Sequence, residues 1–150
     1  MTTNNNRRIL HTMLRVSDLQ QSVEFYTRVI GMRVLRRLDQ PSEKYTLAFL
    51  GFAAEAQNSA LELTYNYGVT HYETGTAYGH IAIAVDNCEQ ACADIKKRGG
   101  HILHKPTPLK GSAEIIAFIS DPDGYQIELI QRPAQPRNSN TKPQTEPQIK

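Results

Sequence analysis

Two histidines and two glutamates recur along the chain at matching intervals, and their side chains are of types that bind metal ions. The first pair is His11 with Glu62, and the second is His80 with Glu128. Imidazole nitrogens combined with carboxylate oxygens suit nickel, cobalt, manganese, iron or zinc. Four such ligands leave two positions of a six-coordinate ion open to water or substrate. The set could therefore support Lewis-acid chemistry.

A simpler explanation of either pair is a histidine satisfied within a sheet and a glutamate at a strand end. Repetition in both halves favours a shared site instead. The histidines lie 69 residues apart, and Ala48-Phe49 matches Ala117-Phe118 at the same interval; the glutamates lie 66 apart. The remaining three histidines have no partner at the repeat interval and are predicted to lie on the surface: His71, His101 and His104.

All four residues are expected on short strands, each opposite the more apolar row of its strand. Side chains alternate between the two faces of a strand. In residues 9–16, His11 therefore shares a face with Met13 and Arg15, while Leu10, Leu14 and Val16 lie on the other. The strand after the turn Asp121-Pro122-Asp123-Gly124 places Glu128 opposite its aliphatic neighbours. A carboxylate on a sheet is costly unless it is paired or bound to a metal.

The elements that carry these residues follow the same order twice. The first half predicts a strand at 9–16, a helix from Ser17-Asp18 to Gly31, and strands near 33–37, 45–52 and 61–67. The second half predicts a strand at 78–85, a helix at 86–98, a strand starting at 102–103, a loop at 105–113, and strands at 115–119 and 125–130. We expect modules at 9–67 and 78–132. A half of about sixty residues is too small to bury its sheet alone, so the two should pack or pair.

Composition excludes several classes of function. The chain has 150 residues and a formal net charge of +2, which is too weak and dispersed for nucleic-acid binding. Arg33, Arg36 and Arg37 are expected on a solvated surface. No apolar run approaches the ~20 residues that span a bilayer, so no membrane partner is expected. The polar first eight residues lack a signal-peptide core, which favours the cytoplasm.

Two further segments are expected to take no part in the chemistry. Cys88 and Cys92 lie one helical turn apart on a predicted helix, a poor geometry for a disulfide, so they are predicted to be free buried thiols. Residues 133–150 contain four of the eight prolines and almost nothing apolar. We expect this segment to form a disordered tail.

Four segments closely resemble the glyoxalase I family, the lactoylglutathione lyases of the vicinal-oxygen-chelate superfamily. The likeness covers about residues 9–132. It implies an α+β fold in which two βαβββ modules form curved mixed sheets. It also implies one divalent metal per site and isomerisation of the methylglyoxal-glutathione hemithioacetal to S-D-lactoylglutathione. The implied ligands are His11, Glu62, His80 and Glu128, and the segments are 10–16, 61–66, 78–82 and 121–129.

The resemblance also indicates the type of metal. A histidine at the first ligand position, here His11, looks like the bacterial type that nickel or cobalt activates. Zinc-dependent relatives often have glutamine at that position. Nickel is therefore the expected cofactor, with cobalt, manganese and zinc as alternatives.

Substrate-binding residues are expected on the same strand faces. Arg15 and Asn66 each lie four residues beyond a candidate ligand, ~13 Å along a strand. An arginine suits a carboxylate and an asparagine suits an amino-acid head group, although an outward salt bridge is the alternative for Arg15. The resemblance implies that both bind the glutamyl end of glutathione. His80 is a further substrate contact, and Lys110 either meets the glycyl carboxylate or is simply solvated.

The implied reaction is a proton transfer next to a carbonyl. The metal would polarise two vicinal oxygens, while a carboxylate moves a proton between adjacent carbons through an enediolate. Glu128 is the expected base, and Glu62 is the second candidate because the site is pseudo-symmetric. The alternatives are an extradiol dioxygenase, an acyl-coenzyme A epimerase and a metal-free binding module. A dioxygenase needs only two histidines and one glutamate, so Glu62 would obstruct it.

The resemblance finally predicts where the site is assembled. Each module supplies one histidine and one glutamate. The loop at 68–77 is short enough that each module could complete its sheet with the opposite module of a second chain. A homodimer would then hold two equivalent sites shared between its subunits.

Overall fold

Two four-stranded sheets of the same topology make up the protein, one from each half of the chain. The computed structural model describes residues 6–134, so residues 1–5 and most of the tail predicted at 133–150 lie outside the described part. The first sheet has the order β1-β4-β3-β2 and the second has the order β5-β8-β7-β6. Their strands are β1 (His11–Arg15), β2 (Arg33–Gln40), β3 (Tyr45–Gly51), β4 (Ala60–Asn66), β5 (Ile81–Val85), β6 (His101–Pro108), β7 (Ile115–Ser120) and β8 (Gln126–Gln131).

Both sheets are mixed, which confirms the predicted pair of βαβββ modules. In each sheet the first and last strands along the chain pair in parallel, β1 with β4 and β5 with β8, and the other pairings are antiparallel. Helix α1 (Leu19–Glu24) follows β1, and helix α2 (Cys88–Lys97) follows β5. The side chains of Asp18 and Asn87 cap the two helices by accepting hydrogen bonds from the amides of Gln21 and Gln90.

The first helix differs from the regular helix that the sequence predicts. Helix α1 passes into a π-helix, η1 (Phe25–Val29), which has a wider turn. The residues buried along the two segments are therefore Leu19, Ser22, Phe25, Tyr26 and Val29. Val23 and Ile30 are only partly buried against the core.

The prediction of a loop at 105–113 is partly wrong, because strand β6 continues to Pro108. Strand β6 is the outer strand of its sheet. A proline, which has no N–H to donate, is tolerated in an outer strand because one side of that strand has no neighbouring strand. Two register shifts occur in its pairing with β7, one between Ile102 and His104 and one between His104 and Thr107. The turn that remains spans 109–114.

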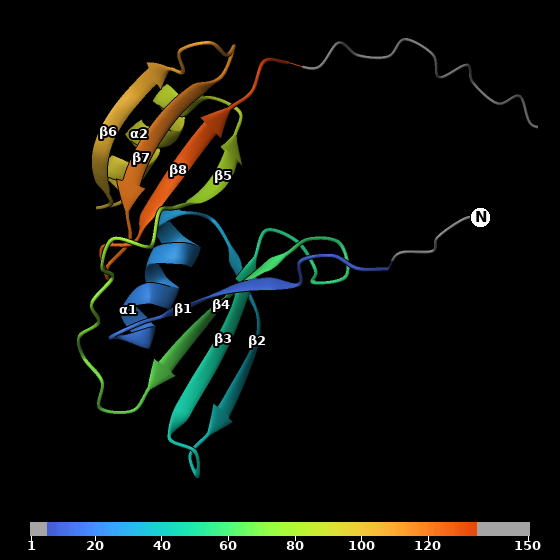
Figure 1. Cartoon of the computed structure of the whole chain (residues 1–150), viewed down its shortest axis with the longest axis vertical. Coiled ribbons are helices and arrows are strands. Elements are labelled where there is room, and N and C mark those ends of the chain that lie inside the picture. The colour runs from blue at the N-terminus through green and yellow to red at the C-terminus, as the bar shows by residue number, and fades with distance from the viewer. Residues whose placement is uncertain (1–5, 135–150) are drawn as a thin grey trace, which may run out of the picture.

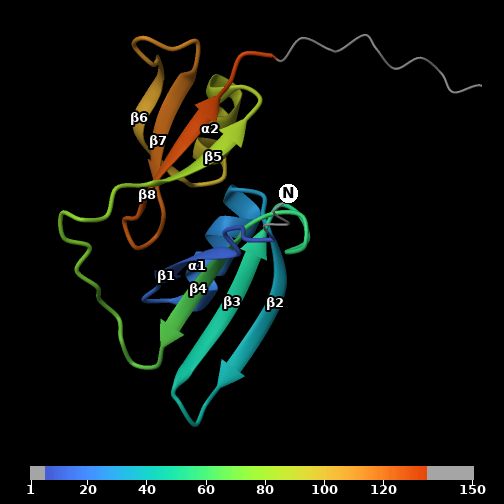
Figure 2. The ribbon, with the colours of Figure 1, turned by 45° about the vertical axis from the view of Figure 1, so that its right-hand side comes forward.

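The two modules meet through α1 and the turn that precedes β8. Figure 1 shows the sheets at opposite ends of the molecule with α1 between them, and Figure 2 shows the same order after rotation. The Tyr26 hydroxyl donates to Oδ2 of Asp121 at 2.7 Å, and the Tyr125 hydroxyl donates to the carbonyl oxygen of Arg15 at 2.7 Å. The Ser17 amide also donates to Asp123 at 3.1 Å. These bonds join residues about one hundred positions apart in the chain, so they fix the modules against each other.

One glycine makes this turn possible. Gly124 has φ +85°, a backbone conformation that residues with a Cβ rarely adopt. The turn lets the Asp121 carboxylate accept from the amides of Asp123 and Tyr125, both at 2.9 Å. Because its carboxylate is bonded on both oxygens, Asp121 tolerates 5% exposure.

The core contains apolar residues from both modules. It includes Leu14, Leu61 and Leu63 of the first sheet and Ile119, Ile127 and Leu129 of the second. Cys88 and Cys92 are buried free thiols, as predicted. Within residues 6–134, neither helix has the length and apolar composition required to cross a bilayer.

Candidate functional site

The first histidine and glutamate meet because β1 and β4 run in parallel. Met13 lies directly opposite Glu62 in this pairing, and His11 lies two residues before Met13, on the same face. The imidazole Nε2 of His11 therefore lies 2.8 Å from Oε2 of Glu62. The Glu62 side chain is only 12% exposed. Burying a carboxylate is costly, and contact with the His11 imidazole offsets part of that cost.

The second pair repeats this geometry in the other sheet. Ala82 lies opposite Glu128, and His80 precedes Ala82 by two residues. Nε2 of His80 lies 2.8 Å from Oε2 of Glu128, whose side chain is 13% exposed. His80 itself lies just before β5, which begins at Ile81, and not within a strand at 78–85 as the sequence predicts.

A phenylalanine stands beside each imidazole. Phe49 lies opposite Glu62 across β3 and β4, and Phe118 lies opposite Glu128 across β7 and β8. The ring of His11 meets Phe49 edge-on with centroids 5.5 Å apart, and His80 meets Phe118 in the same way at 5.4 Å. The interplanar angles are 81° and 78°. The sequence repeat thus extends to the packing around each pair.

The chain by itself does not bring the two pairs together. Across the described residues, no group of three or more histidine, cysteine, aspartate or glutamate side chains lies close enough to hold a metal ion. Each half nevertheless presents one imidazole nitrogen and one carboxylate oxygen within a single contact distance. Two such halves would supply a mixed nitrogen and oxygen donor set that fits a first-row divalent metal.

Two of the predicted substrate-binding residues, Arg15 and Asn66, lie on the strands that carry the first pair. Arg15 pairs with Thr64 across β1 and β4, and alternation along each strand places Arg15 and Asn66 on the face of His11 and Glu62. Within residues 6–134 the guanidinium of Arg15 has no ion-pair partner, so the outward salt bridge considered for it is not formed there. The Asn66 amide donates to the Tyr72 hydroxyl at 3.1 Å. Lys110 lies in the exposed turn after β6.

Two tyrosines, Tyr78 and Tyr125, lie where the two modules meet. Burial raises the pKa of Tyr78 to about 12, and burial also raises the pKa of Tyr125, although the charge of Arg15 opposes this. Both hydroxyls therefore stay protonated at neutral pH. They donate to main-chain carbonyls, Tyr78 to Gln126 at 3.0 Å and Tyr125 to Arg15 at 2.7 Å.

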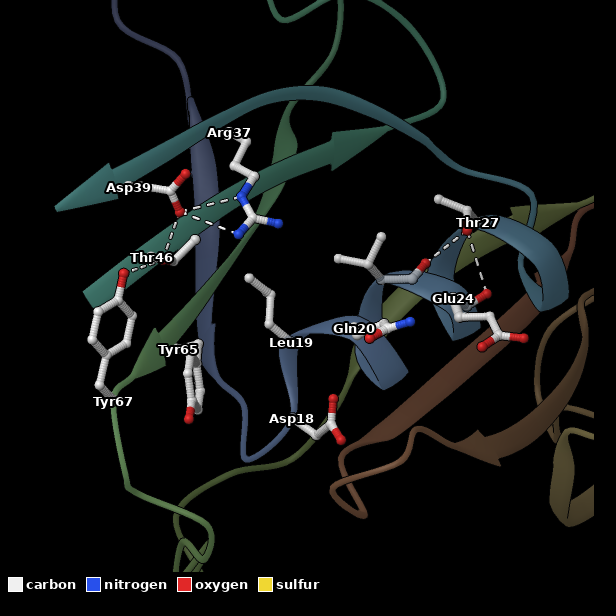
Figure 3. Close-up of a pocket in the computed structure, with 11 residues that line it drawn as sticks. Asp18, Leu19, Gln20, Glu24, Thr27, Arg37, Asp39, Thr46, Tyr65 and Tyr67 are labelled. Carbon is white, nitrogen blue, oxygen red and sulfur yellow. Dashed lines mark hydrogen bonds and ion pairs between the residues drawn. The ribbon is translucent and has the colours of Figure 1, made fainter. Parts of the chain in front are cut away.

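A hollow lies on the helix side of the first sheet, and none of the four candidate ligands lines it. It has a volume of about 730 Å³ and lies between α1 and strands β2 to β4 (Figure 3). The polar side chains on its strand side bond with one another. The Thr46 hydroxyl bonds with Asp39 and with the Tyr67 hydroxyl, each at 2.8 Å, and Arg37 donates to Asp39 at 3.2 Å. We therefore place the functional site on the opposite face.

Comparison with known sequences gives close relatives. The chain is 55% identical over 124 residues to a lactoylglutathione lyase of Escherichia coli O157:H7, covering 83% of this chain and 92% of that protein. It is 58% identical over 126 residues to a probable lactoylglutathione lyase of Vibrio cholerae, covering 84% and 91%.

Solved structures agree with these relatives. Glyoxalase I from Zea mays superposes with a TM-score of 0.81 at 52% identity, over 86% of this chain and 46% of the maize chain. The present chain thus spans about half of that protein. A Leishmania major glyoxalase I superposes with a TM-score of 0.75 at 50% identity, over 83% and 86% of the two chains. A family model matches residues 8–129, and the chain belongs to the Glyoxalase/Bleomycin resistance protein/Dioxygenase superfamily.

Proposed function

We propose that this protein is a lactoylglutathione lyase that isomerises the methylglyoxal-glutathione hemithioacetal to S-D-lactoylglutathione. The observation that carries the proposal is the repeated pair of contacts, His11 to Glu62 and His80 to Glu128, both at 2.8 Å. The relatives from Escherichia coli and Vibrio cholerae, which match over most of their length, carry this activity in their names.

The residues that would hold a divalent metal are His11, Glu62, His80 and Glu128. When bound, the metal would supply Lewis-acid stabilisation for negative charge on two adjacent substrate oxygens. Nickel is the proposed ion, because both proposed nitrogen ligands are imidazoles and His11 occupies the position that distinguishes the nickel type. Both carboxylates are nearly buried, which limits competition by bulk water.

Proton transfer is assigned to the carboxylate of Glu128. The substrate carbon that carries the sulfur loses its proton to this carboxylate, and the same group returns the proton to the neighbouring carbon. The isomerisation needs no external oxidant, because one carbon is oxidised as its neighbour is reduced. Nε2 of His80, 2.8 Å from Oε2, orients the carboxylate. Glu62 occupies the equivalent position and is the second candidate base.

Binding of the glutathione portion is assigned to Arg15 and Asn66, with His80 as a further substrate contact. Arg15 offers an unpaired guanidinium within the described residues, and a guanidinium binds a carboxylate through parallel hydrogen bonds. The carbonyl oxygen of the Asn66 amide remains able to accept from an ammonium group while its nitrogen bonds with Tyr72. Lys110, exposed in its turn, is the proposed contact for the glycyl carboxylate.

The active unit is proposed to be a homodimer. A four-ligand site needs both pairs, yet the pairs lie apart within one chain. Module-to-module hydrogen bonds involving Tyr26 and Tyr125 hold them in that arrangement. Two chains related by a two-fold axis would each present a first pair to the second pair of the partner, giving two sites. Residues 9–67 and 78–132 are the proposed modules, and the cytoplasm is the proposed location.

The direct test is reconstitution of metal-free protein followed by an assay with methylglyoxal and glutathione. We expect no activity in the metal-free protein and recovery on addition of nickel or cobalt, with one metal per proposed site. A catechol with ferrous iron and oxygen provides the competing assay for a ring-cleaving dioxygenase. Oxygen uptake there, without thioester formation in the first assay, would contradict the proposal.

A further inference from the structure

A one-residue bulge places Arg36 on the face that carries His11 and Glu62. Val34 lies opposite Leu50, but the next pairing is Arg36 with Phe49, so Leu35 is the extra residue. Without this shift, Arg36 would lie opposite Ala48, on the face that packs against the core. Bulges of this kind reorient a side chain and are common beside functional sites. Arg36 is exposed, as expected of a surface arginine, and it also packs on the ring of Phe49.

Arg36 covers the phenylalanine that contacts the first imidazole. Its guanidinium carbon lies 3.6 Å from the centroid of the Phe49 ring, and the same ring contacts the imidazole of His11 edge-on. Glu55 holds the guanidinium with two bonds, 2.8 Å from Nε and 3.1 Å from Nη2. This ion pair raises the pKa of Arg36 and lowers that of Glu55.

The second module builds the same row with a different residue. Ile102 lies opposite Ile119, Leu103 is extra, and His104 lies opposite Phe118. The His104 ring meets Phe118 edge-on with centroids 5.8 Å apart at 83°, and Phe118 contacts His80. His104 thus has a structural partner, Arg36, that the sequence repeat does not reveal, because the interval here is 68 rather than 69.

We propose that Arg36 and His104 are positioning residues that fix the two imidazoles of the metal site through the phenylalanine rings. The final torsion of a histidine is soft, so the plane of the ring depends on what packs against it. Phe49 and Phe118 supply that packing, and Arg36 and His104 prevent the two rings from tilting away. Groups behind the metal ligands commonly change metal affinity 10- to 100-fold. The inference rests on the proposed metal site.

The test compares metal affinities of purified dimers by competition with a chelator, and records the visible spectrum of the Co²⁺-loaded proteins. We expect Arg36→Ala and His104→Ala to weaken Ni²⁺ binding about tenfold each and to alter the Co²⁺ spectrum. Arg36→His places in the first module the residue that the second module uses. This variant should lose less affinity than Arg36→Ala, because an imidazole would then contact Phe49 as His104 contacts Phe118.

Arg37→Ala is the matched control. Arg37 is the next residue, is also exposed and also forms an ion pair, but it points into the hollow on the helix side (Figure 3). We expect the Ni²⁺ affinity and the Co²⁺ spectrum of the Arg37→Ala protein to match those of the unaltered protein. Equal weakening by Arg37→Ala would overturn the inference, since the effect would then come from any lost surface charge.

His11→Ala separates failure of this inference from failure of the metal site itself. If His11→Ala weakens Ni²⁺ binding strongly while Arg36→Ala and His104→Ala leave it within about twofold, the positioning role is wrong and the metal site stands. If His11→Ala has no effect on Ni²⁺ binding, the proposed metal site fails as well.

Discussion

Oε2 of Glu128 lies 2.8 Å from Nε2 of His80. The contact joins the residue just before β5 to one in the middle of β8, and it is repeated between His11 and Glu62 at the same separation. Each carboxylate is thereby held on one oxygen by an imidazole while its strand remains part of a sheet. Two copies of one small geometry, and not a single cluster, are what this chain presents.

Replacing Glu128 with glutamine should abolish turnover. The amide retains the size of the side chain but cannot accept the substrate proton, and general acid-base catalysis contributes about 10²- to 10⁴-fold. We expect kcat to fall by at least that range, measured as thioester formation with metal content determined in parallel. Glu89→Gln, on the surface of α2, is the control for loss of one negative charge. Substantial activity in a folded, metal-loaded Glu128→Gln protein would disprove the assignment.

Arg15→Ala should chiefly weaken substrate binding. Its guanidinium is proposed to bind a carboxylate far from the reacting carbons, so its loss should raise KM more than it lowers kcat. Steady-state kinetics over a range of hemithioacetal concentrations separates the two effects. Arg33→Ala, which removes an exposed arginine at the start of β2, is the control. A KM equal to that of the unaltered protein would mean that Arg15 does not meet the substrate.

Complementation between inactive variants tests whether sites are shared. His11→Ala and His80→Ala proteins should each be inactive alone. If each site combines the first pair of one chain with the second pair of another, a mixed dimer has both lesions in one site and an intact second site. Mixing under conditions of subunit exchange should then restore part of the activity. Verified exchange without any recovery would exclude the shared arrangement.

Tyr26→Phe should destabilise the protein in a pH-dependent way. The Tyr26 hydroxyl donates to the buried Asp121 carboxylate at 2.7 Å, and loss of a buried hydrogen bond to a charged group costs about 1.5–3 kcal/mol. Burial raises the pKa of Asp121, while the Tyr26 hydrogen bond lowers it. Removing that bond therefore raises the folded-state pKa of Asp121 further and leaves its unfolded-state pKa unchanged.

The sign follows from this difference. The hydrogen bond favours the ionised carboxylate, so its stabilisation is present at neutral pH and declines as pH falls through the folded-state pKa values of Asp121. The free energies of unfolding of the two proteins should converge as the pH falls below the folded-state pKa values of Asp121. Denaturant titrations at several pH values check this. Tyr45→Phe is the control, because its hydroxyl makes no hydrogen bond within residues 6–134. A penalty independent of pH would contradict the role given to Asp121.

Residues whose faces follow from strand alternation could be predicted from the sequence. His11, Glu62 and Glu128 lie opposite the apolar rows of their strands because a strand repeats every two residues. The matching intervals between the halves also predicted two modules with the same order of elements. Both signals are local or periodic, and neither depends on how distant strands pair.

Only the tertiary structure decided how far apart these groups lie and what surrounds them. The parallel registers of β1 with β4 and of β5 with β8 bring each histidine to its glutamate, and register depends on contacts between segments distant in the chain. The bulges at Leu35 and Leu103 turn Arg36 and His104 onto the site. One extra residue reverses the face of every side chain beyond it, and no feature of composition marks where the extra residue falls.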